Sequence, residues 1–424
     1  MLGRIQDWFD RRGNGWTVLG GWILTRILIL LIFALFERFV IGDVYYYHRK
    51  IVAMFDVGLP QTLNEYPTPV AWILTIPYVL GAGTQTGYAI AFIAGMMALD
   101  AAFTFLLWRH NGRTHDRSIN FWLLFVLFVG PLSYLRFDIL PAVLAGAAVL
   151  YARRTPWLTG VLTGLGAAIK LWPALLWLAF LAHRPTRRTV TVAFLASGVG
   201  LALVSLVFGG WSRLVSPLTW QSGRGLQIES IWATPLMIAR AGDPRQWTVD
   251  MSPFQAYEIF GPGVSVLLVL SNVATLLGLA AIIALYVRGF RAKAPDAVAV
   301  GLVVLSIVGI MIVTNKTLSP QYLLWLGGPM AALLLLKRNQ VTEPEQRTIR
   351  RLAGQLLVLA LLTQLVFPLL YNGLLGGGGR PMLVLATAVT ALRNLALLAF
   401  AVELVIQAWR FLGVDRASVS VESA

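Results

Sequence analysis

The chain has 424 residues, of which 58% are hydrophobic and only 12% are charged, and it contains no cysteine. A soluble domain carries about 25% charged residues, so an ordinary soluble fold is excluded, as are disulfides and thiolate metal sites. The net charge of +15 would suggest nucleic acid for a soluble protein. With a mean hydropathy of +0.73 it instead indicates cationic loops facing anionic lipid, so we expect membrane lipids and no nucleic acid among the partners.

Apolar runs long enough to cross a bilayer as helices of about 20 residues recur along the chain and predict an all-α polytopic membrane protein. The first run is too long for the apolar part of a signal peptide, and no small-residue cleavage site follows it. In chain order, spans are expected near 17–41, 86–108, 119–135, 137–152, 156–169, 171–183, 189–211, 263–287, 296–314, 319–336, 352–370 and 382–409. The spans, about twelve in number, are expected to form a single domain over 1–424. It has a seven-span module at 17–211 and C-terminal spans at 263–409.

The orientation follows from the basic residues, which gather in short connectors that the positive-inside rule places in the cytoplasm. Both termini are then cytoplasmic. The stretch 67–108 must cross the membrane once, so we expect 86–108 to span. The piece at 67–82 should lie along or re-enter the outer leaflet, because its prolines disfavour a straight helix.

Polar motifs collect on the outer side in this threading, within a first outer loop at 42–69, a larger one at 212–262 and three span ends. They are "GDVYYYHRK" (42–50), "YLRFDILP" (134–141), "IKLWP" (169–173), "SGRGLQIES" (222–230) and "NKTLSPQYLLW" (315–325). Charged groups at span ends are costly unless they pair or face a cavity. Five segments far apart in sequence are therefore candidates for one functional site.

This mixture of groups suits the transfer of a sugar carried on a lipid phosphate. A carboxylate would take the proton of the acceptor hydroxyl, cations would stabilise the leaving phosphate, and aromatic rings would pack on the sugar and the lipid chain. Asp43 is the candidate base, with Glu65 and Asp138 as rivals. The candidate phosphate partners are Arg136, Lys170, Arg224 and Lys316, and the candidate cavity aromatics are Tyr45, Tyr46, Tyr66, Trp172, Trp220 and Tyr322.

The same side chains have plainer interpretations. Asp43 is also compatible with a helix-end carboxylate paired with Arg49 or Lys50. Lys170 precedes a Leu-Trp-Pro helix break, where a lysine that extends to the membrane surface would look the same. The segment "RGLQIES" is a plausible loop clasp on a ligand, although a solvated loop would have the same composition.

Arg136 and Asp138 are two residues apart and are equally compatible with a buried ion pair that orients the site. Two further charges, Asp100 and Arg393, lie inside expected spans. Both should face the interior of the helix bundle, because a lipid-facing charge is costly. We assign neither of them a role in the chemistry.

Several motifs together resemble a known family. Asp43 just after the first span, followed by an aromatic stretch and "EYPTPVAW", is similar to the opening of family 87 glycosyltransferases of the GT-C class. "RFDILPAVLAGAAVL", "GLGAAIKLWPALL", "RGLQIES" and "SPQYLLWL" are similar to elements of its actinobacterial branch. The resemblance runs from about residue 40 to about residue 330.

The resemblance implies a GT-C fold, in which a seven-span module carries the catalytic aspartate in its first outer loop and a larger outer loop follows span seven. It also implies a polyprenyl-phosphate sugar donor, commonly mannose, inversion at the anomeric centre, and Asp43 as the general base. The best-known mannosyltransferases of the family carry late histidine motifs where this chain has "SPQYLLW", with Tyr322 as the nearest counterpart. A polyprenyl-phosphate arabinose donor is therefore the alternative.

The expected function is transfer of a sugar to a cell-envelope glycolipid or glycan, on the face of the plasma membrane turned to the periplasm or the outside. A lipid-linked-sugar transporter or flippase is the alternative of another class, although the two related halves typical of a transporter are not evident. We expect no cofactor and no metal, because the histidines lack metal-site spacing; a cation held by Asp43 and Glu65 is the alternative. The expected substrate-binding residues are Glu65, Tyr46, Tyr66, Arg136, Asp138, Lys170, Arg224, Gln227, Glu229, Lys316, Gln321 and Tyr322.

Overall fold

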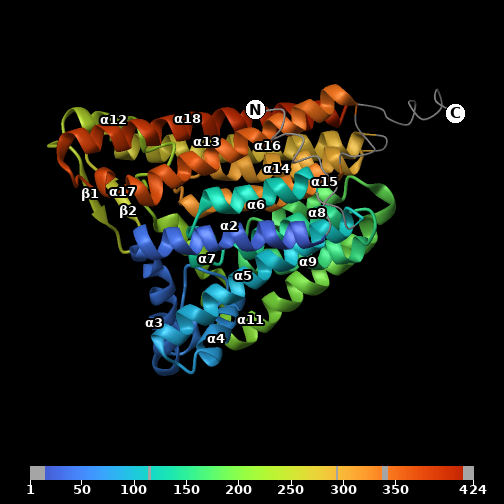
Figure 1. Ribbon diagram of the computed structural model, residues 1–424, viewed down its shortest axis with the longest axis horizontal. Helices are drawn as coiled ribbons and strands as arrows, with labels where there is room; N and C mark the ends of the chain where they lie inside the picture. Colours follow the sequence, from blue (N-terminus) through green and yellow to red (C-terminus); the bar gives the residue numbers. More distant parts are fainter. Residues whose placement is uncertain (1–14, 113–115, 293–294, 337–341, 414–424) are drawn as a thin grey trace.

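The computed structural model describes residues 15–112, 116–292, 295–336 and 342–413, and it is helical almost throughout (Figure 1). The N-terminal elements are α2 (Gly15–Phe36), η1 (Arg38–Ile41), α3 (Gly42–Val57), η2 (Leu59–Gln61), α4 (Thr68–Leu80), α5 (Gln85–His110), α6 (Arg117–Val129), α7 (Leu132–Leu135), α8 (Ile139–Tyr151) and α9 (Pro156–Ile169). Next come α10 (Ala174–Phe180), η3 (Arg184–Thr186), α11 (Arg187–Gly223), α12 (Thr234–Gly242), β1 (Thr248–Met251) and β2 (Tyr257–Phe260). The C-terminal elements are α13 (Val264–Arg291), α14 (Ala297–Thr314), η4 (Pro320–Leu323), α15 (Leu324–Leu336), α16 (Glu343–Gln364), η6 (Leu365–Leu369), α17 (Tyr371–Leu374) and α18 (Gly379–Phe411).

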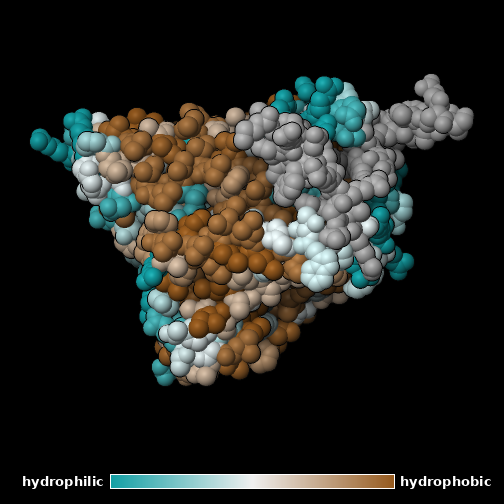
Figure 2. Space-filling model, in the orientation of Figure 1, coloured by the Kyte–Doolittle hydropathy of each residue, from teal (hydrophilic) through white to brown (hydrophobic). Residues whose placement is uncertain are grey.

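The expectation of a helical, multi-pass membrane protein is confirmed. Seven helices in the described part of the chain are long and apolar enough to cross a membrane, and five shorter apolar helices accompany them. Figure 2 shows a broad apolar surface between hydrophilic residues at the left and right ends. In the most apolar 18-residue stretch of α14, 89% of the residues are buried, whereas in that of α11 only 11% are buried. Thus α14 lies inside the bundle, and α11 lies at its surface, with apolar side chains such as Val207 and Phe208 exposed.

Glycines allow the central helices to approach closely, as is common where helices pack inside membranes. A Cβ atom added at Gly328 of α15 would lie 2.1 Å from the carbonyl oxygen of Ala142 in α8. A Cβ atom added at Gly160 of α9 would lie 2.4 Å from the carbonyl oxygen of Val190 in α11. These contacts join helices that carry site residues at their ends.

The structure differs from expectation in the short segments between spans. The expected span at 171–183 contains only the seven-residue helix α10, which rises about 10 Å and cannot cross a core of about 30 Å by itself. Helix α11 continues past the expected end at residue 211 as far as Gly223. Helix α3 and the β1–β2 hairpin occupy much of the two expected outer loops.

The two ends of the bundle differ. Figure 1 shows α3, α17 and the β1–β2 hairpin at its left end, and the start of α2 and the end of α18 toward its right end. Helix α2, the first described helix, therefore begins on the side of the bundle where α18, the last described helix, ends. Which side faces the cytoplasm stays a prediction.

Candidate active site

Asp43 lies in the first turn of α3, where the partial positive charge of a helix N-terminus favours a carboxylate. The helix forms here because Val44, Tyr47 and Ile51 recur on one face and are buried. The Asp43 side chain lies near that face yet remains 43% exposed, and it forms an ion pair with Arg136. The pairing with Arg49 or Lys50 considered from the sequence is not among the ion pairs of the described residues.

Arg136 lies in the extended link between α7 and α8, with φ −132° and ψ 148°. Its neighbours Leu135 and Phe137 are buried, and its own side chain is 12% exposed. Its Nη1 atom contacts the Asp43 carboxylate, whereas its buried Nε atom has no hydrogen-bond acceptor in the described part of the chain. The guanidinium therefore has donor capacity left for an anionic ligand.

Asp138 pairs with Lys170 rather than with Arg136. Lys170 Nζ lies 2.9 Å from Asp138 Oδ1, and the indole N–H of Trp325 donates to the same oxygen at 2.8 Å. The Lys170 ammonium also lies 5.0 to 5.7 Å from the ring centroids of Phe137, Tyr66, Trp325 and Tyr322. The break between α9 and α10 thus directs Lys170 into an aromatic cage.

The loop at 62–67 brings Glu65 and Tyr66 to this cluster. The Tyr46 hydroxyl donates to Glu65 Oε1 at 2.7 Å, which links the loop to α3. The Tyr66 ring packs edge-on against Phe137, with centroids 4.9 Å apart. Burial raises the pKa of Tyr66 well above its ordinary value, so the hydroxyl stays protonated. Eight predicted residues, Asp43, Tyr46, Glu65, Tyr66, Arg136, Asp138, Lys170 and Tyr322, are therefore joined by direct contacts or by contacts with shared partners.

Arg224, Gln227 and Lys316 form a second group beside the hairpin. The backbone N–H of Gln227 donates to the Lys316 carbonyl oxygen at 3.3 Å. Lys316 Nζ donates to the Ser222 carbonyl oxygen at 3.0 Å. Burial lowers the pKa of Lys316, and the nearby charge of Arg224 acts in the same direction. Gln227 Nε2 donates to Ser319 Oγ at 3.3 Å, which connects this group to the η4 segment.

The predicted Gln321 lies in η4, one residue before Tyr322. Its buried Oε1 atom has no hydrogen-bond donor among the residues that the structure describes. An acceptor in this position can receive a ligand hydroxyl.

Glu229 is 1% exposed and faces Arg393 of α18, with 3.6 Å between Glu229 Oε2 and Arg393 Nη2. Burial raises the pKa of Glu229 to about 7, against the opposing effects of Arg393 and Arg136. Arg393 and Asn394 also donate to the Glu229 carbonyl oxygen, at 3.0 and 3.2 Å. Asn394 Nδ2 also lies 3.2 Å from the Ser230 carbonyl oxygen. Arg393 faces the interior as expected, and through Glu229 it supports the site.

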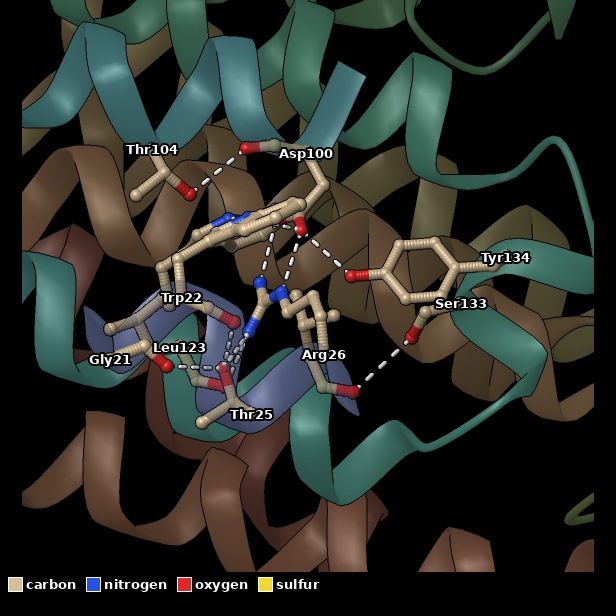
Figure 3. Close-up of polar contacts among 11 residues, drawn as sticks. Gly21, Trp22, Thr25, Arg26, Asp100, Thr104, Leu123, Ser133 and Tyr134 are labelled. Carbon is tan, nitrogen blue, oxygen red and sulfur yellow. Dashed lines mark hydrogen bonds and ion pairs between the residues drawn. The ribbon is translucent and has the colours of Figure 1, made fainter. Parts of the chain in front are cut away.

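Asp100 also faces the interior as expected, and Figure 3 shows the donors that surround it. Arg26 donates to both of its carboxylate oxygens at 2.7 Å. The indole N–H groups of Trp22 and Trp122 donate to it at 2.8 Å, and the Tyr134 hydroxyl donates at 2.7 Å. Both carboxylate oxygens accept hydrogen bonds, and these contacts join α2, α5, α6 and α7. The donor from α7 is Tyr134, which lies two residues before Arg136.

Sequence reasoning missed three contributors to the site. Trp325 stood in a quoted motif, but its contact with Asp138 joins segments nearly two hundred residues apart. Tyr371 of α17 has a pKa raised chiefly by burial, to which the charges of Glu229 and Asp43 add. Arg213, one of four arginines in the expected outer loop at 212–262, binds the backbone of the 62–67 loop. Its sequence context does not distinguish it from the other three.

Comparison with known proteins gives one match. The family model described as Glycosyltransferase family 87 matches residues 65–308, which is more than half of the chain. No curated protein and no solved structure matches the chain. The matched range includes Arg136, Asp138 and Lys170, whereas Asp43 lies before it and Tyr322 after it.

Proposed function

Because the chain belongs to glycosyltransferase family 87, we propose that it moves a sugar from a polyprenyl-phosphate donor to a cell-envelope glycolipid or glycan. The family and the apolar helices make it a membrane glycosyltransferase. Mannose is the proposed sugar, and the plasma membrane is the proposed location, with the site on the outer face. We propose that transfer needs no cofactor and no metal.

One observation carries this proposal: Asp43 is a half-exposed carboxylate whose partner, Arg136, keeps a buried Nε atom without an acceptor in the described chain. A base must be reachable by the acceptor hydroxyl. A cation beside it must be able to stabilise charge on the leaving phosphate. The pair supplies both groups at one place, at the N-terminus of α3.

The proposed reaction is a single displacement. The acceptor oxygen forms a bond with the anomeric carbon as its proton passes to the Asp43 carboxylate. The bond from the anomeric carbon to the phosphate oxygen breaks, and the polyprenyl phosphate leaves with the electron pair. Attack from the side opposite the leaving group inverts the anomeric centre. Arg136 exchanges part of its contact with Asp43 for the phosphate, which frees the carboxylate to accept the proton.

The remaining residues are proposed to form the walls of the site. Tyr46 and Tyr66 offer aromatic surface for the sugar, and the second carboxylate oxygen of Glu65 is free of the contact that Tyr46 makes. Lys170 is held by Asp138 and its aromatic cage, so it supports the wall that Tyr66 and Phe137 form. Arg224 and Lys316 place two more cations at the rim.

The test is transfer by purified protein given polyprenyl-phosphate mannose and a membrane lysate. Asp43→Asn keeps the shape and removes the base, and we expect transfer to fall about 10²- to 10⁴-fold. Asp56→Asn is the matched control, because Asp56 lies on the same helix α3 and is exposed; it should retain activity. Unimpaired transfer by the Asp43→Asn variant would remove Asp43 from the mechanism.

Three further arms separate the alternatives. Transfer from polyprenyl-phosphate arabinose in place of the mannose donor would reassign the sugar. Translocation of the lipid-linked sugar in proteoliposomes, without transfer, would replace the enzyme by a flippase. Loss of transfer in the presence of a chelator, restored by a divalent cation, would overturn the proposal of metal independence.

A further inference from the structure

Helix α11 bends in its C-terminal half. Gly210 has φ 75° and ψ 176°, a conformation that interrupts the helix and that glycine adopts without strain. Beyond the bend, Trp211 and Leu218 are 69% and 62% exposed, whereas Arg213 is 1% exposed. The segment after Gly210 therefore presents apolar side chains outward and one buried arginine inward.

Arg213 and its neighbour Ser216 bind the backbone of the 62–67 loop. Arg213 Nη1 donates to the Tyr66 carbonyl oxygen at 2.8 Å, and Nη2 donates to that of Leu63 at 3.1 Å. Ser216 Oγ lies 2.9 Å from the carbonyl oxygen of Asn64 and accepts from Arg213 Nη1 at 3.0 Å. Three of four consecutive loop carbonyl groups are thus held by two side chains of one helical turn.

The loop needs such support because its backbone is strained. Leu63 has φ 51°, a left-handed conformation that is strained for a residue with a branched side chain. The Tyr66 N–H closes a tight turn on the Leu63 carbonyl oxygen at 3.0 Å. Strained backbone persists only where its surroundings determine it. The Arg213 guanidinium is a rigid, forked donor, which suits binding of two carbonyl groups at once.

We infer that Arg213 and Ser216 are positioning residues, which hold the 62–67 loop so that Glu65 and Tyr66 face the substrate. The inference rests on the proposed function, because that function gives Glu65 and Tyr66 their substrate. The bend at Gly210 is then part of the site, since it turns α11 over the loop. Within the described residues, the hydrogen bonds of the Arg213 side chain go to loop carbonyl groups and to Ser216, so its effect on transfer passes through the loop.

The first test needs no enzymatic activity. Within 62–66, the Thr62 and Tyr66 amides donate to the Leu59 and Leu63 carbonyl oxygens. Their hydrogen exchange should become at least about tenfold faster in Arg213→Ala, and less so in Ser216→Ala, because local protection depends on local opening. The matched control is Arg153→Ala, since Arg153 also binds a backbone carbonyl, that of Pro295, at 2.7 Å. It should leave exchange at 62–66 unchanged. Unchanged exchange at 62–66 in Arg213→Ala would overturn the inference.

The second test measures kcat/KM of transfer and asks whether the effect of Arg213 depends on Glu65. A misplacement of about 1 Å can cost about 100-fold in rate, so Arg213→Ala should lower kcat/KM by up to about 100-fold, with Arg213→Lys in between. In a Glu65→Gln background the same substitution should lose much of its effect, because coupled residues are not additive. If the losses in kcat/KM caused by the Arg213 and Glu65 substitutions multiply in full, then Arg213 does not act through Glu65. If wild-type protein shows no transfer, the proposed function fails, and the exchange test still decides the role of Arg213.

Discussion

Lys170 is held over Phe137 with its ammonium 5.0 Å from the ring centroid, while its charge is balanced by Asp138 at 2.9 Å. The pair is nearly enclosed, with side chains 14% and 2% exposed. It joins the end of α9 to the start of α8, and the indole of Trp325 fixes the shared oxygen. Three segments of the site thus depend on one ion pair.

Removal of either partner of this pair should be costly. Lys170→Met leaves the Asp138 carboxylate buried without its cation, and such changes cost about 3 to 5 kcal/mol. We expect a similar loss for Asp138→Leu. The double variant should lose less than the sum of the two, because no unpaired charge remains. Unfolding in detergent micelles measures all three, and strict additivity would contradict the pairing.

The Asp100 cluster predicts a contrast between two tyrosines. Tyr134→Phe removes a hydroxyl that donates to the Asp100 carboxylate at 2.7 Å, and a hydrogen bond to a charged group contributes about 1.5 to 3 kcal/mol. Tyr286→Phe removes a hydroxyl that donates to the neutral carbonyl of Leu175, worth about 0.5 to 1.5 kcal/mol. The free energies of unfolding should rank in that order. Equal losses would show that the Asp100 charge adds nothing.

Glu229 predicts a dependence of stability on pH. Burial raises its pKa from 4.5 to about 7, so the folded state binds a proton more tightly than the unfolded chain in this window. The free energy of unfolding should therefore fall as pH rises from 4.5 to about 7, by at most about 1.4 kcal/mol per pH unit from this group. The groups facing Glu229 are Arg393, Arg136 and Tyr371. Glu229→Gln should flatten the curve.

A second buried carboxylate provides the comparison. Burial also raises the pKa of Glu37 to about 7, opposed by the hydrogen bond from Gln364. Glu37→Gln should remove its own share of the slope, and the double variant with Glu229→Gln should lose the shares of both carboxylates. A slope that neither substitution changes would assign the pH dependence to other groups.

Two glycines predict opposite outcomes for the same substitution. Gly328→Ala places a Cβ atom 2.1 Å from the carbonyl oxygen of Ala142, so α15 and α8 must separate. Such overpacking costs about 1 to 3 kcal/mol. Gly354 of α16 has no atom within 4 Å of an added Cβ, and Gly354→Ala should stabilise by up to about 1 kcal/mol through helix propensity. Thermal unfolding of both variants measures the difference.

The sequence predicted the long apolar helices well, because composition and length alone identify them. It also placed Asp100 and Arg393 in the interior, because a charge inside a span has no inexpensive alternative. It missed the short elements. The segment at 42–57 carries charges throughout, so its composition suggests a loop. Only the helical spacing of Val44, Tyr47 and Ile51, which are buried, indicates a helix. Likewise, α10 is apolar enough for a span but only seven residues long.

The candidate site was predictable as a set of motifs but not as a set of pairs. Arg136 and Asp138 are close in sequence, yet each pairs with a residue far away, Asp43 and Lys170. Arg136 has an extended backbone whereas Asp138 already has the helical backbone of the α8 N-terminus, and which partner each side chain meets depends on how distant helices pack. Arg213 was missed for the same reason, since its acceptors are backbone carbonyl groups about 150 residues away.

The support that α18 gives to Glu229 has a consequence for biogenesis. The carbonyl oxygens of Glu229 and Ser230 are bound by Arg393 and Asn394, which are synthesised more than 160 residues later. A nascent chain that has inserted its earlier helices therefore still lacks the donors that fix this loop. We expect the enzyme to mature only when its last helix has packed, so that unfinished chains in the membrane do not transfer sugar.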